Sequence, residues 1–161
     1  MIGQRLRQYR EASRKPDPAD FDLARQFLEE RLFSLFAAQS PRDVVHSAAT
    51  ARWLRERGQD DHDLLVAALL HDIGKGEQRR WDRVGYVLAQ EGRVAGLVGA
   101  RGSRIAFRRA VARSVAHSEL SAALMAAAGA SARAVELARL HHAAPAGDSA
   151  RRLLQRADAA S

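Results

Sequence analysis

The chain has 161 residues, of which 47% are hydrophobic, and this length and composition exclude general disorder and predict one domain with a sizeable core. It contains no cysteine, which excludes disulfides, thiolate zinc sites and a thiol nucleophile. Its net charge of +7 is compatible with phosphate-bearing partners or with a solvated arginine-rich surface. Alanine, leucine and arginine are abundant while β-branched and aromatic residues are sparse, so the composition predicts an all-α fold, a single-domain helical bundle.

Four helices are predicted in the first half of the chain, spanning residues 1–15, 21–39, 41–57 and a stretch from the aspartates at 60 and 61 to Gly74. Asp17 or Asp20 is expected to cap the second helix. Ser40 followed by Pro41 is a strong start for the third helix, and Gly58 is expected to end it. The second helix is amphipathic and either completes the bundle or makes a dimer contact.

Five further helices are predicted in the second half, spanning residues 78–90, 105–116, 117–128, 132–140 and 149–160. The stretch 91–103 holds four glycines and is predicted to be a loop or a broken segment. His117 is expected to begin a separate alanine-rich helix, and Ser131 to cap the helix after it. A loop containing Pro145 and Gly147 precedes the last helix.

The residues from His71 to Lys75 read His-Asp-Ile-Gly-Lys and follow an unbroken apolar run, 64–70. This run is too short to cross a bilayer and is typical of a buried helix. Asp72 would then stand at the C-terminal end of that helix, where the helix dipole is already negative. A buried carboxylate must be paired, protonated or bound to a metal. A cation shared by His71, Asp72 and residues from elsewhere is therefore the first functional hypothesis.

The chain contains six histidines, at positions 46, 62, 71, 117, 141 and 142. A lone histidine among apolar neighbours, such as His46, is more often structural than a ligand, but several of them beside a buried His-Asp step favour a metal site. His141 and His142 are expected to end a helix and to point about 100° apart. Such a pair suits two ions, or one ion and a substrate, better than joint chelation of one ion.

Imidazole and carboxylate donors without sulfur suit Mn²⁺, Fe²⁺, Co²⁺, Ni²⁺ or Zn²⁺, and Mg²⁺ less well. Two such ions about 3.5–4 Å apart can activate a bridging hydroxide and clamp a phosphoryl group. Lys75, one of only two lysines in the chain, stands beside the His-Asp pair, and a compact cation there suits a phosphoryl oxygen.

With a histidine on one helix, a His-Asp doublet ending the next and an aspartate on a late helix, the chain resembles the HD superfamily of metal-dependent phosphohydrolases. The matching positions are His46, His71, Asp72 and Asp158, and the extension to His-Asp-Ile-Gly-Lys makes the match more specific. The resemblance covers roughly residues 40–160 and implies an HD-type helical domain over 40–161. Residues 1–39 would form an N-terminal helical extension of undefined role.

The resemblance also implies roles for individual residues. His46, His71, Asp72 and Asp158 would hold one metal ion, and Asp72 would bridge to a second ion. His117, His141 and His142 would complete the coordination of the second ion, as in the HD-GYP branch and related two-metal proteins. Lys75 would contact the phosphate or the bridging hydroxide and act with Asp72 in catalysis. His62 lies among aspartates and is expected to be exposed and not a ligand.

The sequence departs from the HD-GYP pattern after His142, where the Gly-Tyr-Pro loop is absent and Ala143–Asp148 stand instead. A cyclic dinucleotide substrate is therefore not implied. Arg42 occupies the position at which some three-metal members have a glutamate, so a third ion is not expected. Asp158 sits three residues from the end of the sequence, on a helix that would fray unless docked or metal-bound.

The leading functional hypothesis is a metal-dependent phosphohydrolase that uses a metal-activated hydroxide to cleave a phosphomonoester or phosphodiester, expected to be that of a nucleotide. Hydrolysis of cyclic or dinucleoside polyphosphates is the alternative within enzymes. A non-catalytic HD signalling or interaction module would show eroded ligands, whereas all seven candidate positions are occupied.

The partner is expected to be a small phosphorylated molecule. No helix-turn-helix, RNA-recognition or zinc-finger pattern accompanies the positive charge, so a nucleic acid partner is not expected. Residues 1–15 are polar and arginine-rich and show no signal peptide, and no stretch is long and apolar enough to span a membrane. A soluble cytoplasmic protein without membrane contact is the expectation, and the oligomeric state stays open.

Overall fold

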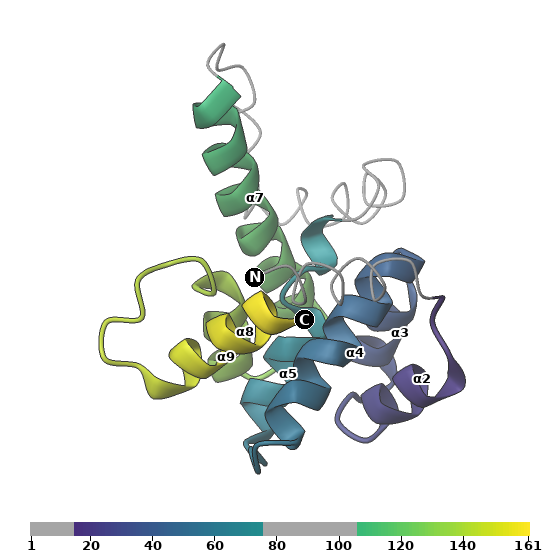
Figure 1. Ribbon diagram of the computed structural model, residues 1–161. Helices are drawn as coiled ribbons and strands as arrows, with labels where there is room; N and C mark the ends of the chain where they lie inside the picture. Colours follow the sequence, from purple (N-terminus) through teal and green to yellow (C-terminus); the bar gives the residue numbers. More distant parts are fainter. Residues whose placement is uncertain (1–14, 76–105) are drawn as a thin grey trace, which may run out of the picture.

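The computed structural model describes residues 15–75 and 106–161, the latter with backbone only over 106–116. The described residues fold into seven α-helices and one short 3-10 helix, η1, and they contain no β-strand, which confirms the all-α prediction (Figure 1). Their bounds are α2 Pro18–Arg25, α3 Glu30–Ala37, α4 Pro41–Arg55, α5 His62–Leu70, η1 Ile73–Lys75, α7 Ala106–Ala127, α8 Ala132–Arg139 and α9 Ser149–Ala160. The predicted helices at 1–15 and 78–90 and the predicted loop at 91–103 lie outside the described residues, apart from Lys15.

The centre of the molecule is α5, which packs against α3, α4, α8 and α9 (Figure 1). Every residue from Leu64 to Leu70 is at most 2% exposed. A helix that is apolar on all sides has no face for solvent, so it must be surrounded by other elements. The apolar run in the sequence therefore corresponds to the buried central helix that was predicted.

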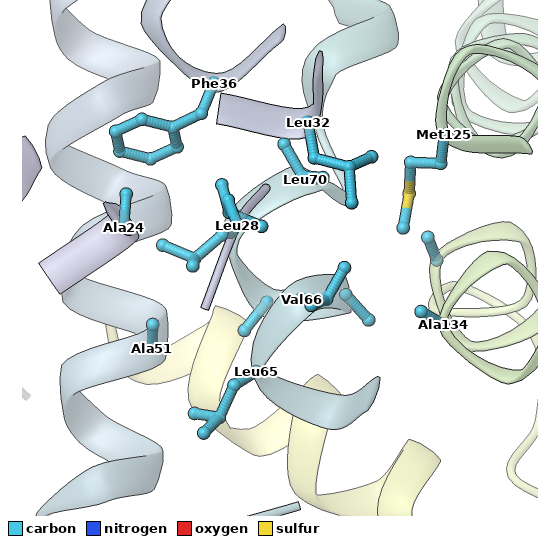
Figure 2. Close-up of a cluster of buried hydrophobic side chains, with 14 of the residues drawn as sticks. Ala24, Leu28, Leu32, Phe36, Ala51, Leu65, Val66, Leu70, Met125 and Ala134 are labelled. Atoms are coloured by element: carbon cyan, nitrogen blue, oxygen red, sulfur yellow. The ribbon is translucent and has the colours of Figure 1, made fainter. Parts of the chain in front are cut away.

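The predicted single helix over residues 21–39 is wrong, because the chain turns at residues 26–29 and forms α2 and α3 instead. The break lets α2 lie against α4 while α3 reaches α5, which one straight helix of this length could not do. Leu28, Leu32 and Phe36 enter the same hydrophobic cluster as Leu65 and the rest of α5 (Figure 2). Helices α2 and α3 thus belong to the bundle formed by the described residues.

Polar contacts fix α2 in place. Asp17 caps α2 and forms a capping box with Asp20, in agreement with one of the two predicted caps. Asp20 is fully buried, and Arg52 of α4 donates a hydrogen bond from its guanidinium nitrogen to Asp20 Oδ1 at 3.0 Å. The Arg52–Asp20 ion pair links the N-terminal helices to the helix that carries His46.

The predicted starts of α4 and α5 are confirmed, since Ser40 caps α4 and Asp61 caps α5. Their ends differ from the prediction. The last residue of α4 is Arg55, and Gly58 adopts a positive φ of 72° three residues later. The helix α5 ends at Leu70, so the His-Asp doublet lies in the turn between α5 and η1 instead of within a helix that runs to Gly74.

The long helix α7 replaces the two shorter helices predicted at 105–116 and 117–128, and the prediction that His117 starts a helix is wrong. His117, Ser118 and Glu119 lie in the middle of α7. A serine favours helix starts only where the preceding residues favour another conformation, whereas here alanine-rich sequence continues on both sides without glycine or proline. His117 therefore projects from a continuous helix that packs against α8 and η1.

The last two helices begin where they were predicted, with Ser131 capping α8 and Asp148 capping α9. The terminal helix α9 is docked against α4 and α5, and its residues Leu154 and Ala157 are completely buried. This packing removes the reason to expect fraying around Asp158. In the described part of the chain, no helix combines the length and apolar character needed to cross a membrane.

Candidate metal centre

The seven histidine and aspartate residues singled out in the sequence come together from five elements. They are His46 in α4, His71 and Asp72 in the turn after α5, His117 in α7, His141 and His142 in the turn after α8, and Asp158 in α9. The buried end of α5 brings His71 and Asp72 to the middle of this set, where His71 is completely buried and Asp72 is 2% exposed. The neighbouring helices supply the remaining side chains around them.

One group of potential ligands consists of His46, His71, Asp72 and Asp158, here called the first group. Their potential ligand atoms all lie within 4.8 Å of one another. His46 Nε2 is 2.9 Å from Asp158 Oδ1, and His71 Nε2 is 3.4 Å from the same oxygen. This spacing is small enough for one ion to be reached by all four side chains after modest rotation.

His117, His141 and His142 form a second group, again with ligand atoms within 4.8 Å of one another. His142 Nε2 lies 3.3 Å from His117 Nε2, and the ring centroids of His141 and His142 are 3.8 Å apart. These adjacent histidines lie in the turn after α8 and not at the end of a helix, and both belong to the same group as His117. The turn directs both rings toward His117.

Asp72 stands between the two groups and presents one carboxylate oxygen to each. Its Oδ2 is 3.5 Å from His71 Nε2 and 3.7 Å from His46 Nε2. Its Oδ1 is 3.4 Å from His117 Nε2 and 3.8 Å from His141 Nε2. A carboxylate oriented in this way can interact with a cation on either side at the same time.

The charges around Asp72 keep it ionised. Burial alone would raise the pKa of Asp72, but the positive charge of His71, together with His117 and Lys75, holds the pKa well below its usual range. Lys75 Nζ donates a hydrogen bond to Asp72 Oδ2 at 2.5 Å. The ammonium group of Lys75 remains partly exposed, with 43% of its side chain accessible to solvent.

The backbone fixes the tautomers of the two most buried histidines. His71 Nδ1 is 3.0 Å from the carbonyl oxygen of Ala68, and His141 Nδ1 is 2.6 Å from that of Ala138. A carbonyl only accepts, so Nδ1 must carry the hydrogen in both rings. Each Nε2 then faces the cluster, and a backbone bond of this kind commonly orients metal-bound histidine.

Three buried atoms of this cluster have no hydrogen-bond partner among the described residues: His71 Nε2, Asp72 Oδ1 and His141 Nε2. Burial lowers the pKa of His141 to about 3, so its Nε2 is a lone-pair acceptor at neutral pH. Burial would also lower the pKa of His71, but Asp72 and Asp158 outweigh it and raise that pKa, so the first group attracts positive charge. Buried acceptors that face one another are stable only if a cation or a proton is shared among them, and this donor set fits a divalent transition metal.

Several residues support the cluster, and apart from Gly74 of the His-Asp-Ile-Gly-Lys segment they carry no signal in the sequence. Gly74 approaches α7 so closely that its N–H donates to Ser121 Oγ at 2.9 Å. The buried amide of Gln39 donates to the carbonyl oxygen of Leu69 at 3.3 Å, near the end of α5. Gln155 of α9 donates to the carbonyl oxygens of His141 and Ala143. Amide and hydroxyl groups recur throughout surface sequence, so no pattern marks these residues before the fold is known.

Two side chains were predicted to lie outside the ligand set. His62 is exposed as the first residue of α5, where its ring lies 6.5 Å from that of Phe27 and belongs to neither group. Arg42, at which no ligand to a third ion was expected, is exposed in the first turn of α4. An arginine at this position supplies no metal ligand.

Comparison with known proteins agrees with this geometry. The family model of the HD domain matches residues 44–161, a stretch that contains both ligand groups and Lys75. Searches of curated proteins and of solved structures returned no match. The family match covers well over half of the chain, from the second turn of α4 to the end of α9. The chain therefore belongs to the HD domain family, whose members are largely metal-dependent hydrolases.

Proposed function

We propose that this HD domain protein is a two-metal phosphohydrolase that cleaves a phosphomonoester or phosphodiester of a nucleotide. The observation that carries this proposal is the set of three buried polar atoms, His71 Nε2, Asp72 Oδ1 and His141 Nε2, without hydrogen-bond partners in the described part of the chain. A purely structural cluster would be expected to pair its buried polar atoms internally. In a metal site, such buried polar atoms would instead bind the ion.

Each of the two groups would provide the position of one ion. His46, His71, Asp72 and Asp158 would hold the first ion. His117, His141 and His142 would hold the second ion, with Asp72 as the bridge between them. This assignment is supported by the opposite orientation of the two Asp72 oxygens, one within 3.7 Å of His46 and the other within 3.4 Å of His117.

Bound divalent ions would supply an activated water and polarise the phosphoryl oxygens of the substrate. The donors are nitrogen and oxygen only, which favours Mn²⁺, Fe²⁺, Co²⁺, Ni²⁺ or Zn²⁺ over Mg²⁺. The hydrogen bonds from His71 Nδ1 and His141 Nδ1 to backbone carbonyl oxygens would keep Nε2 of each ring available to bind an ion.

We expect Lys75 to contact the phosphoryl group of the substrate. It sits on η1, three residues from Asp72, and its ammonium group is partly open to solvent. From there it can place a positive charge beside a phosphoryl oxygen while its hydrogen bond to Asp72 fixes its direction. His142 is also exposed, so the phosphate would approach from the side shared by Lys75 and His142.

The proposal is tested by measuring hydrolysis of a generic phosphomonoester, a generic phosphodiester and a panel of nucleotides with Mn²⁺, Fe²⁺, Ni²⁺, Zn²⁺ or Mg²⁺. We expect metal-dependent turnover of at least one substrate. His71→Ala and Asp72→Ala should abolish it, because they remove buried ligand atoms. His62→Ala, an exposed histidine in the same part of the chain, is the matched control and should retain it.

Lys75→Met separates binding of metal from chemistry. It should leave the metal content unchanged and lower turnover by about 10²-fold or more, as loss of one donor to a developing charge does. A wild-type protein that binds ions but hydrolyses none of these substrates would instead favour a non-catalytic HD module. A wild-type protein that binds no ion would contradict the proposal as a whole.

A further inference from the structure

Gln155 connects the two ligand groups through α9. Its side-chain Nε2 donates hydrogen bonds to the carbonyl oxygen of His141 at 2.9 Å and to that of Ala143 at 2.6 Å. Asp158 of the first group follows three residues later on the same helix. One turn of α9 therefore contributes an anion to the first group and holds the backbone that presents the second group.

The backbone held in this way begins an otherwise exposed loop. Residues 142–144 are exposed, whereas His141 itself is 2% exposed. The N–H of Ala143 donates to the carbonyl oxygen of Leu140 at 2.9 Å and closes the turn that contains both histidines. The amide of Gln155 thus ties the carbonyls of His141 and Ala143 to α9, and Arg151 of the same helix donates to the carbonyl oxygen of Ala144, one residue further on, at 2.9 Å.

The helix α9, to which the turn is bonded, is itself held in place by the hydrophobic core. Leu154 and Ala157, on either side of Gln155 in sequence, are completely buried in the core. The primary amide has two hydrogens on Nε2, and both carbonyl oxygens lie within hydrogen-bond distance of this one atom. Neither a carboxylate nor an apolar side chain of similar length can replace these two donations.

We propose that Gln155 is a positioning residue that holds the His141–His142 turn against α9 and thereby fixes the second ligand group relative to the first. This inference rests on the proposed two-metal function. Two ions that share Asp72 require the second group to lie at a defined distance from Asp158 and His71. The Gln155 amide directly links the turn of the second group to the helix that carries Asp158. Loss of the link should affect the second ion much more than the first.

The test compares Gln155→Glu and Gln155→Met with the wild-type protein by calorimetric titration with Mn²⁺ and Ni²⁺. Both variants should weaken binding of the second ion by about 10–100-fold, as loss of a partner that orients a ligand does, and leave the first ion unchanged. The negative charge of Gln155→Glu would by itself attract a cation, so weaker binding in that variant reports on geometry. Gln59→Glu is the control, because Gln59 makes a similar bond to a carbonyl oxygen, that of Arg57, on an exposed loop.

Hydrogen exchange in the metal-free protein gives an independent measurement. The amide of Ala143 should exchange faster in Gln155→Met than in the wild-type protein, while amides in α5 stay protected. Equal weakening of both ions, or of neither ion, would overturn the inference while the two-metal proposal stands. A wild-type protein that takes up no ion would overturn both.

Discussion

His46 Nε2 lies 2.9 Å from Asp158 Oδ1, although 112 positions separate the two residues in the chain. The contact joins α4 to the terminal helix α9 directly beside His71. Burial alone would raise the pKa of Asp158, but its hydrogen bond with His46 and the nearby charge of His71 keep that pKa well below the usual range. An ionised carboxylate is thus held at the edge of the first group by the packing of the last helix.

Asp158→Asn should remove this negative charge with little change in shape. Loss of a partner that orients a ligand weakens metal binding by at most about 100-fold. If Asp158 is itself a ligand, as proposed, the affinity for the first ion should fall by more than this. Metal titration measures this. Asp22→Asn, at a side chain that is 66% exposed and pairs with Arg25, is the control and should bind metal normally. Normal binding by Asp158→Asn would exclude Asp158 as a ligand.

Gly74→Ala should destabilise the protein, because a Cβ at this position would lie 2.3 Å from the backbone carbonyl oxygen of His117. The expected loss is about 1–3 kcal/mol of unfolding free energy, as for other overpacked sites, and η1 would move away from α7. Ser121→Ala, which removes only the hydrogen bond to the Gly74 N–H, should lose about 1 kcal/mol. The free energy is measured by urea unfolding.

The double variant Gly74→Ala, Ser121→Ala distinguishes the two contacts. It relieves the approach of the new Cβ to Ser121 Oγ but leaves the clash with the His117 carbonyl. It should therefore be no more stable than Gly74→Ala alone. Restored stability in the double variant would mean that the side chain of Ser121, and not the backbone of α7, limits the size of residue 74.

Arg52→Met tests whether α2 and α3 belong to the same cooperative unit as the HD domain. Asp20 is fully buried, and loss of its partner would leave a carboxylate with fewer compensating contacts. We expect a loss of about 1–3 kcal/mol in a single unfolding transition. On an Asp20→Asn background the same substitution should have a smaller effect. Equal effects on both backgrounds would show that the ion pair contributes nothing.

The charge of His71 should make stability and metal binding depend on pH in opposite directions. Burial would lower the pKa of His71, but Asp72 and Asp158 raise it above the ordinary value of 6.5. Its stabilisation of the metal-free fold is then complete below pH 6.5 and is lost as pH rises through the raised pKa. Melting of the EDTA-treated protein between pH 6 and 9 measures this loss, which His71→Gln should lack.

An ion bound by the first group has to displace the same proton from His71. Its affinity should therefore rise by about tenfold for each pH unit until His71 is deprotonated. Metal titrations at several pH values give this slope, and His62→Gln should not alter it because His62 is exposed. An affinity independent of pH in this range would mean that His71 is not a ligand.

Local signals in the sequence were enough to predict where several helices begin. Ser40, Asp61 and Ser131 cap α4, α5 and α8, since a short polar side chain before an apolar segment satisfies the free N–H groups of a helix start. The apolar run before His71 was equally clear, because a segment without a polar face must be central in a small domain. These features depend on neighbouring residues only.

Features that depend on tertiary contacts could not be predicted in this way. The turn that divides 21–39 into α2 and α3 follows from the positions of α4 and α5, and the apolar spacing alone does not reveal it. The joint orientation of His141 and His142 arises from the turn after α8. The role of Gln155 could not be predicted either, because its two acceptor carbonyls lie 12 and 14 residues away along the chain.

The most direct test of the two-metal site is the metal content of protein saturated with Mn²⁺ or Ni²⁺ and freed of excess ion. The wild-type protein should retain two ions per chain, one for each ligand group. His46→Ala and His142→Ala should each lose one ion, from the first and second group, and Asp72→Ala should lose both. Wild-type protein that retains no ion, or an Asp72→Ala variant that retains both, would contradict the two-metal centre.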